Sequence, residues 1–284
     1  MPLTRSVRRS LIEASLGSAR RRALGLAFLV APALFGGLPA SAGDSFERLE
    51  AVLARLAPDM VLLDLAGLRA SCAGELRCAA ERVVAAWPAG ARLQAVPEAD
   101  PQLVRSGAVV RSVGAAQRRP SGALRLRIEH FGRRASEQVR RALADLRPDD
   151  RLELDLRGHR GGSVRRMLEI AALFVGPRPQ ALTIVGQRGA VALGIPAPAR
   201  RLELAGIDVL IGPETRSSAE VLAALLHRYA DARLLGKRTF GKNWAEQPLK
   251  VATGWYLMVR AGEIRIDGER LEGGLLPDGP LPDS

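Results

Sequence analysis

The sequence predicts an α/β domain in which a mainly parallel sheet is covered by helices, preceded by a small helical region. Strand and helix patterns alternate from residue 123 onward, whereas residues 44–90 carry apolar side chains at helical spacing only. The 284-residue chain is also long enough for one main domain with a sizeable core and a smaller appendage. We therefore expect one large α/β domain, preceded by an N-terminal helical region.

Residues 1–42 are predicted to be an export signal. A basic start precedes the apolar run "ALGLAFLVAPALFGGL", and Ala40-Ser41-Ala42 forms a small-residue cleavage site. The run contains Pro32 and is shorter than the ~20 residues that a membrane-spanning helix needs. We expect a mature protein that begins near Gly43, has no integral membrane segment and is periplasmic or secreted.

The composition argues against a nucleic-acid partner. The formal net charge is +12, but the arginines are scattered and only 4% of the residues are aromatic. A nucleic-acid surface would instead show clustered basic residues with interleaved aromatic ones. The positive charge is therefore expected on a solvated surface or in contact with an anionic membrane surface.

Residues 43–122 are predicted to be a helical region followed by a linker. The segment "SFERLEAVLARLA" has helical spacing, and residues 88–122 are rich in turn residues, with one or two short strands. Cys72 and Cys78 are the only cysteines, and a disulfide between them is expected in an exported chain. Such a bridge requires a break in the helix, and two free buried cysteines are the alternative. No histidine lies near enough to suggest a metal site.

Strand and helix patterns alternate in residues 123–284, which are predicted to form the α/β domain. The expected strands are "ALRLRIEHF", "RLELDLRG", "ALTIV", "IDVLIG" and "ARLLG", and the expected helices are "SEQVRRALADL", "SVRRMLEIAALFV" and "AEVLAALLHRY". The first strand has one polar face, and the last helix is almost wholly apolar and therefore buried. In open sheets of this kind, chemistry collects at the loops that follow strand ends.

One such loop, "DLRGHRGGS", ends in two glycines before a helix. Adjacent glycines let the backbone approach a ligand closely, and amides at a helix start point toward negative charge. Gly161 and Gly162 are therefore candidates for an oxyanion hole, and an ordinary glycine turn is the alternative. The loop is not a phosphate loop, because the Gly-Lys-Ser/Thr ending is missing.

A second loop, "GPETRSSAEVL", places two serines at the start of the buried helix. Ser217 and Glu220 have the spacing of a capping box, which is a structural role. A hydroxyl at a helix N-terminus also lies in a field that favours an alkoxide-like transition state. Ser217 is therefore a candidate nucleophile as well as a cap.

A lysine follows 25 residues later, in "RTFGKNW". The chain contains 42 lysines and arginines, yet only Lys237, Lys242 and Lys250 are lysines. Arginine would serve equally well for surface charge, but its guanidinium stays charged and cannot accept a proton. Lys242 is therefore a candidate general base, and a surface lysine is the alternative.

Four motifs in order give residues 123–278 a resemblance to the carboxyl-terminal processing (tail-specific) serine peptidases. "LDLRGHRGG" is similar to that family's Leu-Asp-Leu-Arg loop ending in Gly-Gly, and "SSAE" to its nucleophile segment. "LLGKRTFGK" resembles its segment ending in Thr-Phe-Gly-Lys, and "GERLEGGLLPD" its closing Gly-x-x-Pro-Asp stretch. The resemblance implies a fold related to crotonase and the caseinolytic peptidases.

The resemblance also implies residue roles. Ser217 would be the nucleophile and Lys242 the general base of a Ser-Lys dyad acting on a polypeptide through an acyl-enzyme, without metal or other cofactor. The residues around this pair would be Gly161, Gly162 and Ser218 as the oxyanion hole, with Glu220 and Thr239 as supporting groups.

Several positions depart from the family pattern. Family members often carry a glutamine four residues after the lysine to orient it, whereas this chain has Glu246 there and Gln247 one position later. Both are candidates for orienting Lys242, but the Glu246 carboxylate would favour the charged lysine and weaken it as a base. Arg228 replaces an acidic residue found in some members. His159 stands where asparagine is usual, as a substitute base or a bystander.

Two hypotheses from different classes follow. The first is an exported serine endopeptidase with a Ser-Lys dyad. The second is a catalytically inactive homologue that binds a peptide or a partner protein as a scaffold, which the departures at Glu246, Arg228 and His159 favour. Acyl-CoA chemistry, suggested by the related fold, lacks a nucleotide site. No PDZ-like segment is evident, so specificity for a substrate's carboxyl terminus is not implied.

Overall fold

The computed structural model describes Leu49 and residues 65–73, 75–86, 92–95, 112–186, 189–252 and 255–282. The expected export signal, residues 1–42, lies outside these residues. So does the helix expected over residues 45–57, apart from the buried, helical Leu49.

A five-stranded sheet with the order β2-β3-β4-β7-β8 forms the base of the α/β domain. Its strands are β2 (Gln117–Arg118), β3 (Leu124–Arg127), β4 (Arg151–Asp155), β7 (Gly206–Ile211) and β8 (Arg233–Gly236). Strands β3, β4, β7 and β8 pair in parallel, and β2 pairs antiparallel with β3. The prediction of a mainly parallel sheet is confirmed for these strands.

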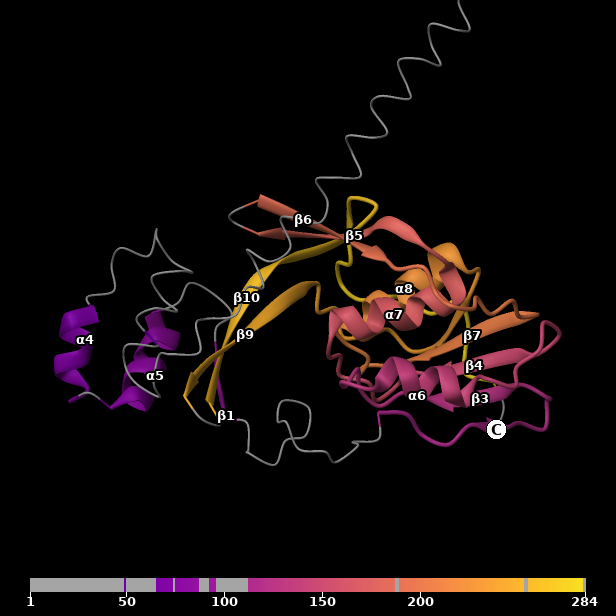
Figure 1. The fold of residues 1–284 in the computed structure, drawn as a ribbon, viewed down its shortest axis with the longest axis horizontal. Coiled ribbons are helices and arrows are strands. Elements are labelled where there is room, and N and C mark those ends of the chain that lie inside the picture. The colour runs from indigo at the N-terminus through magenta and orange to yellow at the C-terminus, as the bar shows by residue number, and fades with distance from the viewer. Residues whose placement is uncertain are drawn as a thin grey trace, which may run out of the picture. The chain divides into compact units, whose positions relative to one another are not determined.

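Three helices pack against one another in chain order over this sheet (Figure 1). They are α6 (Ala135–Ala142), α7 (Val164–Val175) and α8 (Ser218–Tyr229). The sequence explains the limits of α7: the Ser163 side chain accepts the Arg166 N–H at its start, and Gly176 ends it with φ = 80°. These are the helices that the sequence predicts.

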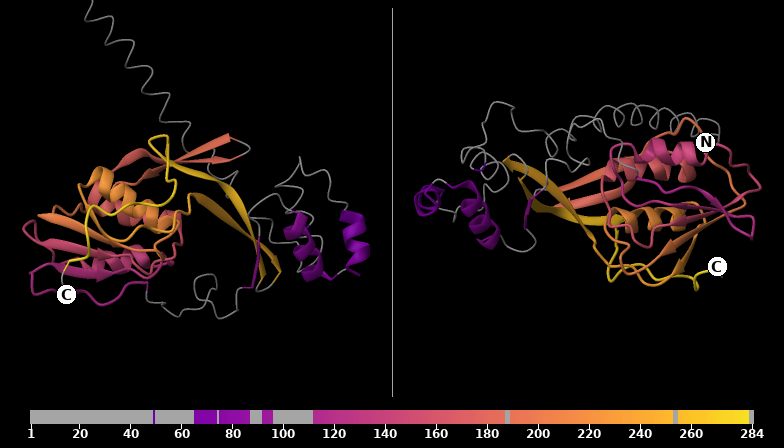
Figure 2. Two further views of the ribbon diagram at one scale, coloured as in Figure 1. Left: turned by 180° about the vertical axis from the view of Figure 1, so that it is seen from behind. Right: turned by 90° about the horizontal axis from the view of Figure 1, so that it is seen from below.

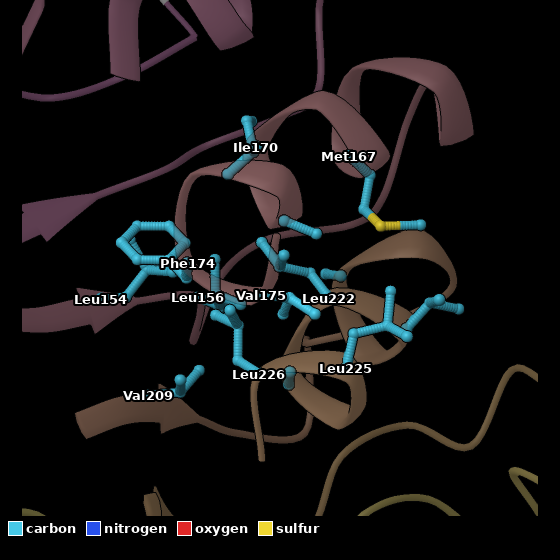
Figure 3. Close-up of a cluster of buried hydrophobic side chains, with 14 of the residues drawn as sticks. Leu154, Leu156, Met167, Ile170, Phe174, Val175, Val209, Leu222, Leu225 and Leu226 are labelled. Atoms are coloured by element: carbon cyan, nitrogen blue, oxygen red, sulfur yellow. The ribbon is translucent and has the colours of Figure 1, made fainter. Parts of the chain in front are cut away.

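Apolar side chains from the sheet and from α7 and α8 form one core. Leu154 of β4 and Val209 of β7 lie beneath Phe174 of α7 and Leu222 and Leu226 of α8, and all five are 2% exposed or less (Figure 3). Burying a side chain of this size contributes about 1.5–3 kcal/mol. The core therefore fixes the positions of the two helix starts relative to the strand ends.

The alternate positions of the same strands carry ion pairs. Glu153, Asp155 and Asp208 are each 5–7% exposed and lie against arginines: Arg125 with Glu153 at 2.6 Å, Arg157 with Asp155 at 2.7 Å, and Arg233 with Asp208 at 2.7 Å. Strand alternation places these groups on the opposite face from the core. The helices therefore cover one face of the sheet, and the second face is the polar one that the first strand's alternation predicts.

A second, antiparallel sheet of six strands contains the order β1-β10-β5-β6, and β9 and β11 also pair with β10. Its strands are β1 (Arg92–Ala95), β5 (Arg178–Gly186), β6 (Gly189–Ile195), β9 (Trp244–Ala252), β10 (Trp255–Ile266) and β11 (Glu269–Arg270). The long strands β9 and β10 form a twisted ribbon, seen from two further directions in Figure 2. The expected strand "ALTIV" is β5, so it belongs to this antiparallel sheet rather than to the parallel one.

The described part of the N-terminal region consists of α4 (Leu65–Ser71) and α5 (Leu76–Ala86). The helical conformation is interrupted between them at Ala73, which has φ = 49°. Cys72 and Cys78 form a disulfide with a Cα–Cα distance of 5.6 Å. The interruption at Ala73 is the helix break that the pairing requires. None of the helices in the described residues has the length and apolarity that crossing a membrane requires.

Candidate active site

Ser217 occupies the sharp turn between β7 and α8. Its backbone has φ = 60° and ψ = −130°, a conformation that residues other than glycine rarely adopt. The turn is fixed from below by Thr215, whose hydroxyl donates to the Leu156 carbonyl at 2.8 Å and accepts the Gly212 N–H at 3.0 Å. Strained residues of this kind cluster at functional sites, because the surrounding structure must hold them.

The glycine loop lies directly against Ser217. A Cβ atom at Gly161 would stand 3.0 Å from the Ser217 Cβ, and one at Gly162 would stand 2.9 Å from the Phe131 backbone nitrogen. Both glycines also have positive φ, at 99° and 141°. The sequence "GG" is therefore required here for close approach as well as for backbone conformation.

The three expected oxyanion donors have different environments. The Gly161 N–H donates to the His159 Nδ1 at 2.9 Å, so it is engaged inside the protein. Among the hydrogen bonds of the described residues, the N–H groups of Gly162 and Ser218 have no acceptor. The Ser218 hydroxyl donates to the Gly162 carbonyl at 3.1 Å, which joins the two loops. The arrangement leaves one amide from each loop for a ligand.

Glu220 holds the nucleophile segment and the lysine segment together. Its carboxylate is 1% exposed, and its Oε2 accepts the N–H groups of Ser217 at 2.8 Å and Lys242 at 2.9 Å. Its Oε1 accepts the Thr239 hydroxyl and the Gly241 N–H, each at 2.6 Å. Four donors satisfy this buried carboxylate, which would otherwise be costly to bury. The expected supporting roles of Glu220 and Thr239 agree with these contacts.

The predicted capping box at α8 is present, but its two hydrogen bonds differ in quality. The glutamate arm is the 2.8 Å bond from the Ser217 N–H described above. In the serine arm, the Ser217 hydroxyl faces the Glu220 N–H without a side-chain cap hydrogen bond of good geometry. The Glu220 N–H instead donates to the Ser217 carbonyl at 2.9 Å. The Ser217 hydroxyl therefore contributes less to capping α8 than the sequence pattern predicts.

The closing stretch of the chain anchors the lysine loop. The Leu275 N–H donates to the Thr239 hydroxyl at 2.7 Å, and the Thr239 N–H donates to the Leu275 carbonyl at 3.1 Å. The Phe240 N–H donates to the Thr215 carbonyl at 3.0 Å. Sequence reasoning identified the closing motif by resemblance but gave it no role. Its role is to hold the loop that carries Lys242 beside the turn that carries Ser217.

The Lys242 ammonium pairs with the Glu246 carboxylate. The Nζ–Oε2 distance is 3.0 Å, and the two side chains are 15% and 10% exposed. No hydrogen bond joins the Lys242 ammonium to the Ser217 hydroxyl among the described residues. Glu246 thus takes the position expected for an orienting residue, whereas the side chain of Gln247 lies outside the described part of the chain.

His159 does not have the properties of a substitute base. Its side chain is fully buried, and burial, reinforced by the charge of the nearby His130, lowers its pKa to about 3. Its Nδ1 already accepts the Gly161 N–H. The imidazole is therefore neutral at physiological pH, and its basic nitrogen is occupied.

Arg228 lies at the opposite end of α8 from Ser217. Eleven residues of helix separate the two by about 16 Å. Arg228 pairs with Asp267 in the β10–β11 turn at 3.3 Å and with Glu269 of β11 at 2.7 Å. Its departure from the family pattern therefore concerns the packing of α8 and not the chemistry at Ser217. In the described residues, no group of three or more His, Cys, Asp or Glu side chains is placed to hold a metal ion.

The strained serine, the glycine loop with an unused amide and the loop carrying the lysine all lie within one continuous stretch of the chain. Residues 123–280, more than half of the chain, match the family model described as peptidase family S41. The chain therefore belongs to peptidase family S41, and the expected resemblance is confirmed.

Curated relatives agree with this assignment. The chain is 28% identical over 163 residues to a carboxyl-terminal-processing protease of Picosynechococcus sp., a match that covers 55% of this chain and 38% of the relative. It is 30% identical to a carboxyl-terminal-processing protease of Synechocystis sp., covering 54% of this chain and 36% of the relative. The match thus spans well under half the length of these two relatives.

Solved structures share the fold. The photosystem II D1 C-terminal processing protease superimposes with a TM-score of 0.50 at 20% identity, covering 63% of this chain and 50% of that one. A putative S41 protease from Bacteroides fragilis superimposes with a TM-score of 0.53 at 18% identity, covering 61% and 51%. At these identities the likeness establishes the fold, and the predicted α/β fold class is confirmed.

Proposed function

We propose that the protein is an active serine endopeptidase that hydrolyses polypeptides with Ser217 as nucleophile and Lys242 as general base. The observation that carries this proposal is the Glu220 carboxylate, which binds the backbone N–H groups of both residues on the same oxygen, at 2.8 Å and 2.9 Å. A single buried group therefore sets the relative positions of nucleophile and base. Membership of peptidase family S41 supports the same assignment.

The proposed reaction follows from these positions. Neutral Lys242 removes the proton from the Ser217 hydroxyl as its oxygen attacks the peptide carbonyl. The N–H groups of Gly162 and Ser218 bind the oxyanion of the tetrahedral intermediate, in which negative charge first appears. Lys242 then delivers its proton to the leaving amine, and the peptide C–N bond breaks to leave an acyl-enzyme. Lys242 then takes a proton from a water molecule as the water oxygen attacks the ester carbonyl. The bond from the acyl carbon to the Ser217 oxygen breaks, Lys242 returns the proton to that oxygen, and the acid product leaves.

Glu246 holds the side chain of Lys242 in place. The Nζ and the carboxylate lie 3.0 Å apart, and both side chains are largely buried. We infer that Glu246 orients the base.

The ion pair also supports the second candidate function, an inactive homologue that binds a peptide or partner protein. If the lysine never releases its proton, the same site would bind a polypeptide without cleaving it. The two functions differ in whether Ser217 reacts. Both imply a polypeptide ligand and neither needs a cofactor.

Turnover of an unstructured protein, together with covalent labelling, distinguishes the two. We expect the mature protein to cleave the substrate and a fluorophosphonate probe to add its phosphonyl group to Ser217, as located by peptide mass mapping. Binding of the substrate without cleavage, and no adduct, would establish the scaffold function.

We also propose that the protein is exported, with residues 1–42 removed. The basic start, short apolar run and Ala-Ser-Ala site support this proposal, and so does the Cys72–Cys78 pairing, which requires an oxidising compartment. N-terminal analysis of the exported protein should begin near Gly43, and thiol counting on the unreduced, unfolded protein should find none. Retention of residues 1–42 would refute the signal, and two titratable thiols would refute the disulfide.

A further inference from the structure

His159 contacts both loops that supply the unused amides. Its backbone carbonyl accepts the N–H of Arg216, the residue before the nucleophile, at 3.1 Å. Its Nδ1 accepts the N–H of Gly161 at 2.9 Å, and its own N–H donates to the Leu156 carbonyl at 3.0 Å. One fully buried residue thus links the end of β4, the glycine loop and the turn before Ser217.

These contacts constrain the peptide group that follows. The Gly161 N–H points inward to the imidazole, and the Gly162 carbonyl is held by the Ser218 hydroxyl at 3.1 Å. Gly161 and Gly162 would otherwise be the most freely rotating residues in the loop, because they lack side chains. The Gly161 carbonyl shares a peptide group with the Gly162 N–H, and it accepts the Phe131 N–H at 3.3 Å. The contacts of these three groups together restrict the orientation of the Gly162 N–H.

The imidazole makes this contact in one defined state. Because Nδ1 accepts a hydrogen bond, the ring proton must lie on Nε2. That Nε2 is buried without any hydrogen-bond partner, and the ring packs on Phe131 with centroids 4.1 Å apart. A buried donor without an acceptor costs free energy that an apolar side chain would avoid. The hydrogen bond that Nδ1 accepts from Gly161 is therefore the one polar contact of the imidazole among the described residues.

We propose that His159 is a positioning residue that aligns the Gly162 N–H with the Ser218 N–H by accepting the Gly161 N–H. This inference rests on the proposed peptidase function. The oxyanion forms only after the substrate has bound, so misplacing one of its donors lowers kcat and leaves KM nearly unchanged. A role in folding alone would not produce that separation.

Three variants test the role of the acceptor. His159→Leu keeps the burial but removes the acceptor, and a misplaced oxyanion donor should lower kcat by about 10- to 100-fold with little change in KM. His159→Asn places a carbonyl oxygen near the position of Nδ1 and should recover most of the lost kcat. Arg160→Ala is the matched control, because its exposed 2.7 Å pair with Glu214 joins the same two loops from the solvent side. Exposed pairs contribute little, so its kcat should remain near wild type.

Nitrogen NMR of the imidazoles tests the geometry independently of activity and of variant folding. The chain contains three histidines, so an untagged protein gives a simple spectrum, which the His159→Asn variant assigns. We expect His159 to show an unprotonated Nδ1 and a protonated Nε2 that do not titrate between about pH 5 and 8.

The reverse tautomer, or titration in that range, would overturn the proposal. So would a folded His159→Leu variant with wild-type kcat, or one in which only KM changes. Absence of Ser217-dependent turnover in the wild type would instead refute the proposed function, and the positioning role with it, whatever the NMR signals show.

Discussion

The helices α7 and α8 both begin with a serine after a loop that leaves the parallel sheet, but the two starts are built differently. Ser163 caps α7 in an extended conformation (φ = −63°, ψ = 116°), and its side chain accepts the Arg166 N–H at 3.3 Å. Ser217 begins α8 at φ = 60° and ψ = −130°. The side chain of Ser163 accepts a hydrogen bond from an N–H group at the start of its helix, whereas Ser217 is held in a strained conformation by its surroundings.

A carboxylate from each helix shows what keeps Ser217 in its strained conformation. Glu169 of α7 is 25% exposed and accepts from the Ser136 hydroxyl and from arginine side chains. Glu220 of α8 is buried and accepts backbone N–H groups from Ser217, Gly241 and Lys242. The two carboxylates therefore differ in that Glu220 is buried and binds backbone N–H groups of both the Ser217 turn and the Lys242 loop, whereas Glu169 binds side chains only.

The largest expected difference is between the two serines themselves. Ser217→Ala should abolish turnover, with kcat lowered at least ~10³-fold, because it removes the nucleophile. Ser163→Ala should leave kcat near wild type and lower the free energy of unfolding by about 1 kcal/mol, the usual contribution of an N-cap. Turnover assays and urea unfolding measure the two effects. If both variants lost only stability, the two helix starts would be equivalent.

The two carboxylates should differ next. Glu220→Gln has one acceptor oxygen for four donors, so it should lower the free energy of unfolding by about 3 kcal/mol and strongly reduce kcat. Glu169→Gln breaks partly exposed contacts and should cost less than about 1 kcal/mol. Denaturant unfolding and steady-state kinetics provide the comparison. Equal losses for the two variants would show that Glu220 is no more than a cap.

The sequence predicted the parallel sheet, the three helices and the order of the motifs, because each depends on local periodicity or on residue type. It missed the β9–β10 ribbon, since pairing such as Tyr256 with Lys250 leaves only a weak local pattern. It assigned β5 to the wrong sheet for the same reason. At the candidate site, it proposed Ser217, Glu220 and Lys242, whose segments the structure joins, but it did not predict the hydrogen bond from the Gly161 N–H to His159. That contact depends on burial and loop conformation, which the letters "GHRGG" do not specify.

The smallest expected effect concerns the ion pair beside the α8 start. Glu246→Gln loses the charge of the 3.0 Å pair but keeps an oxygen that can accept a hydrogen bond from the Lys242 Nζ, so kcat should change by less than about tenfold. Steady-state kinetics of the wild type and of this variant test the effect. Complete loss of turnover would contradict a role limited to orienting the lysine.

The central claim, that Lys242 serves as a base, is tested most directly by replacing it with arginine. Lys242→Arg keeps the positive charge and can keep a pair with Glu246, but a guanidinium cannot accept the proton of Ser217. Lys237 is exposed and lies five residues earlier in the chain, so Lys237→Arg is the matched control. With folding checked by circular dichroism, we predict that Lys242→Arg loses turnover of an unstructured substrate as completely as Lys242→Ala, whereas Lys237→Arg retains it. Cleavage by Lys242→Arg at a rate near wild type would contradict the Ser-Lys mechanism.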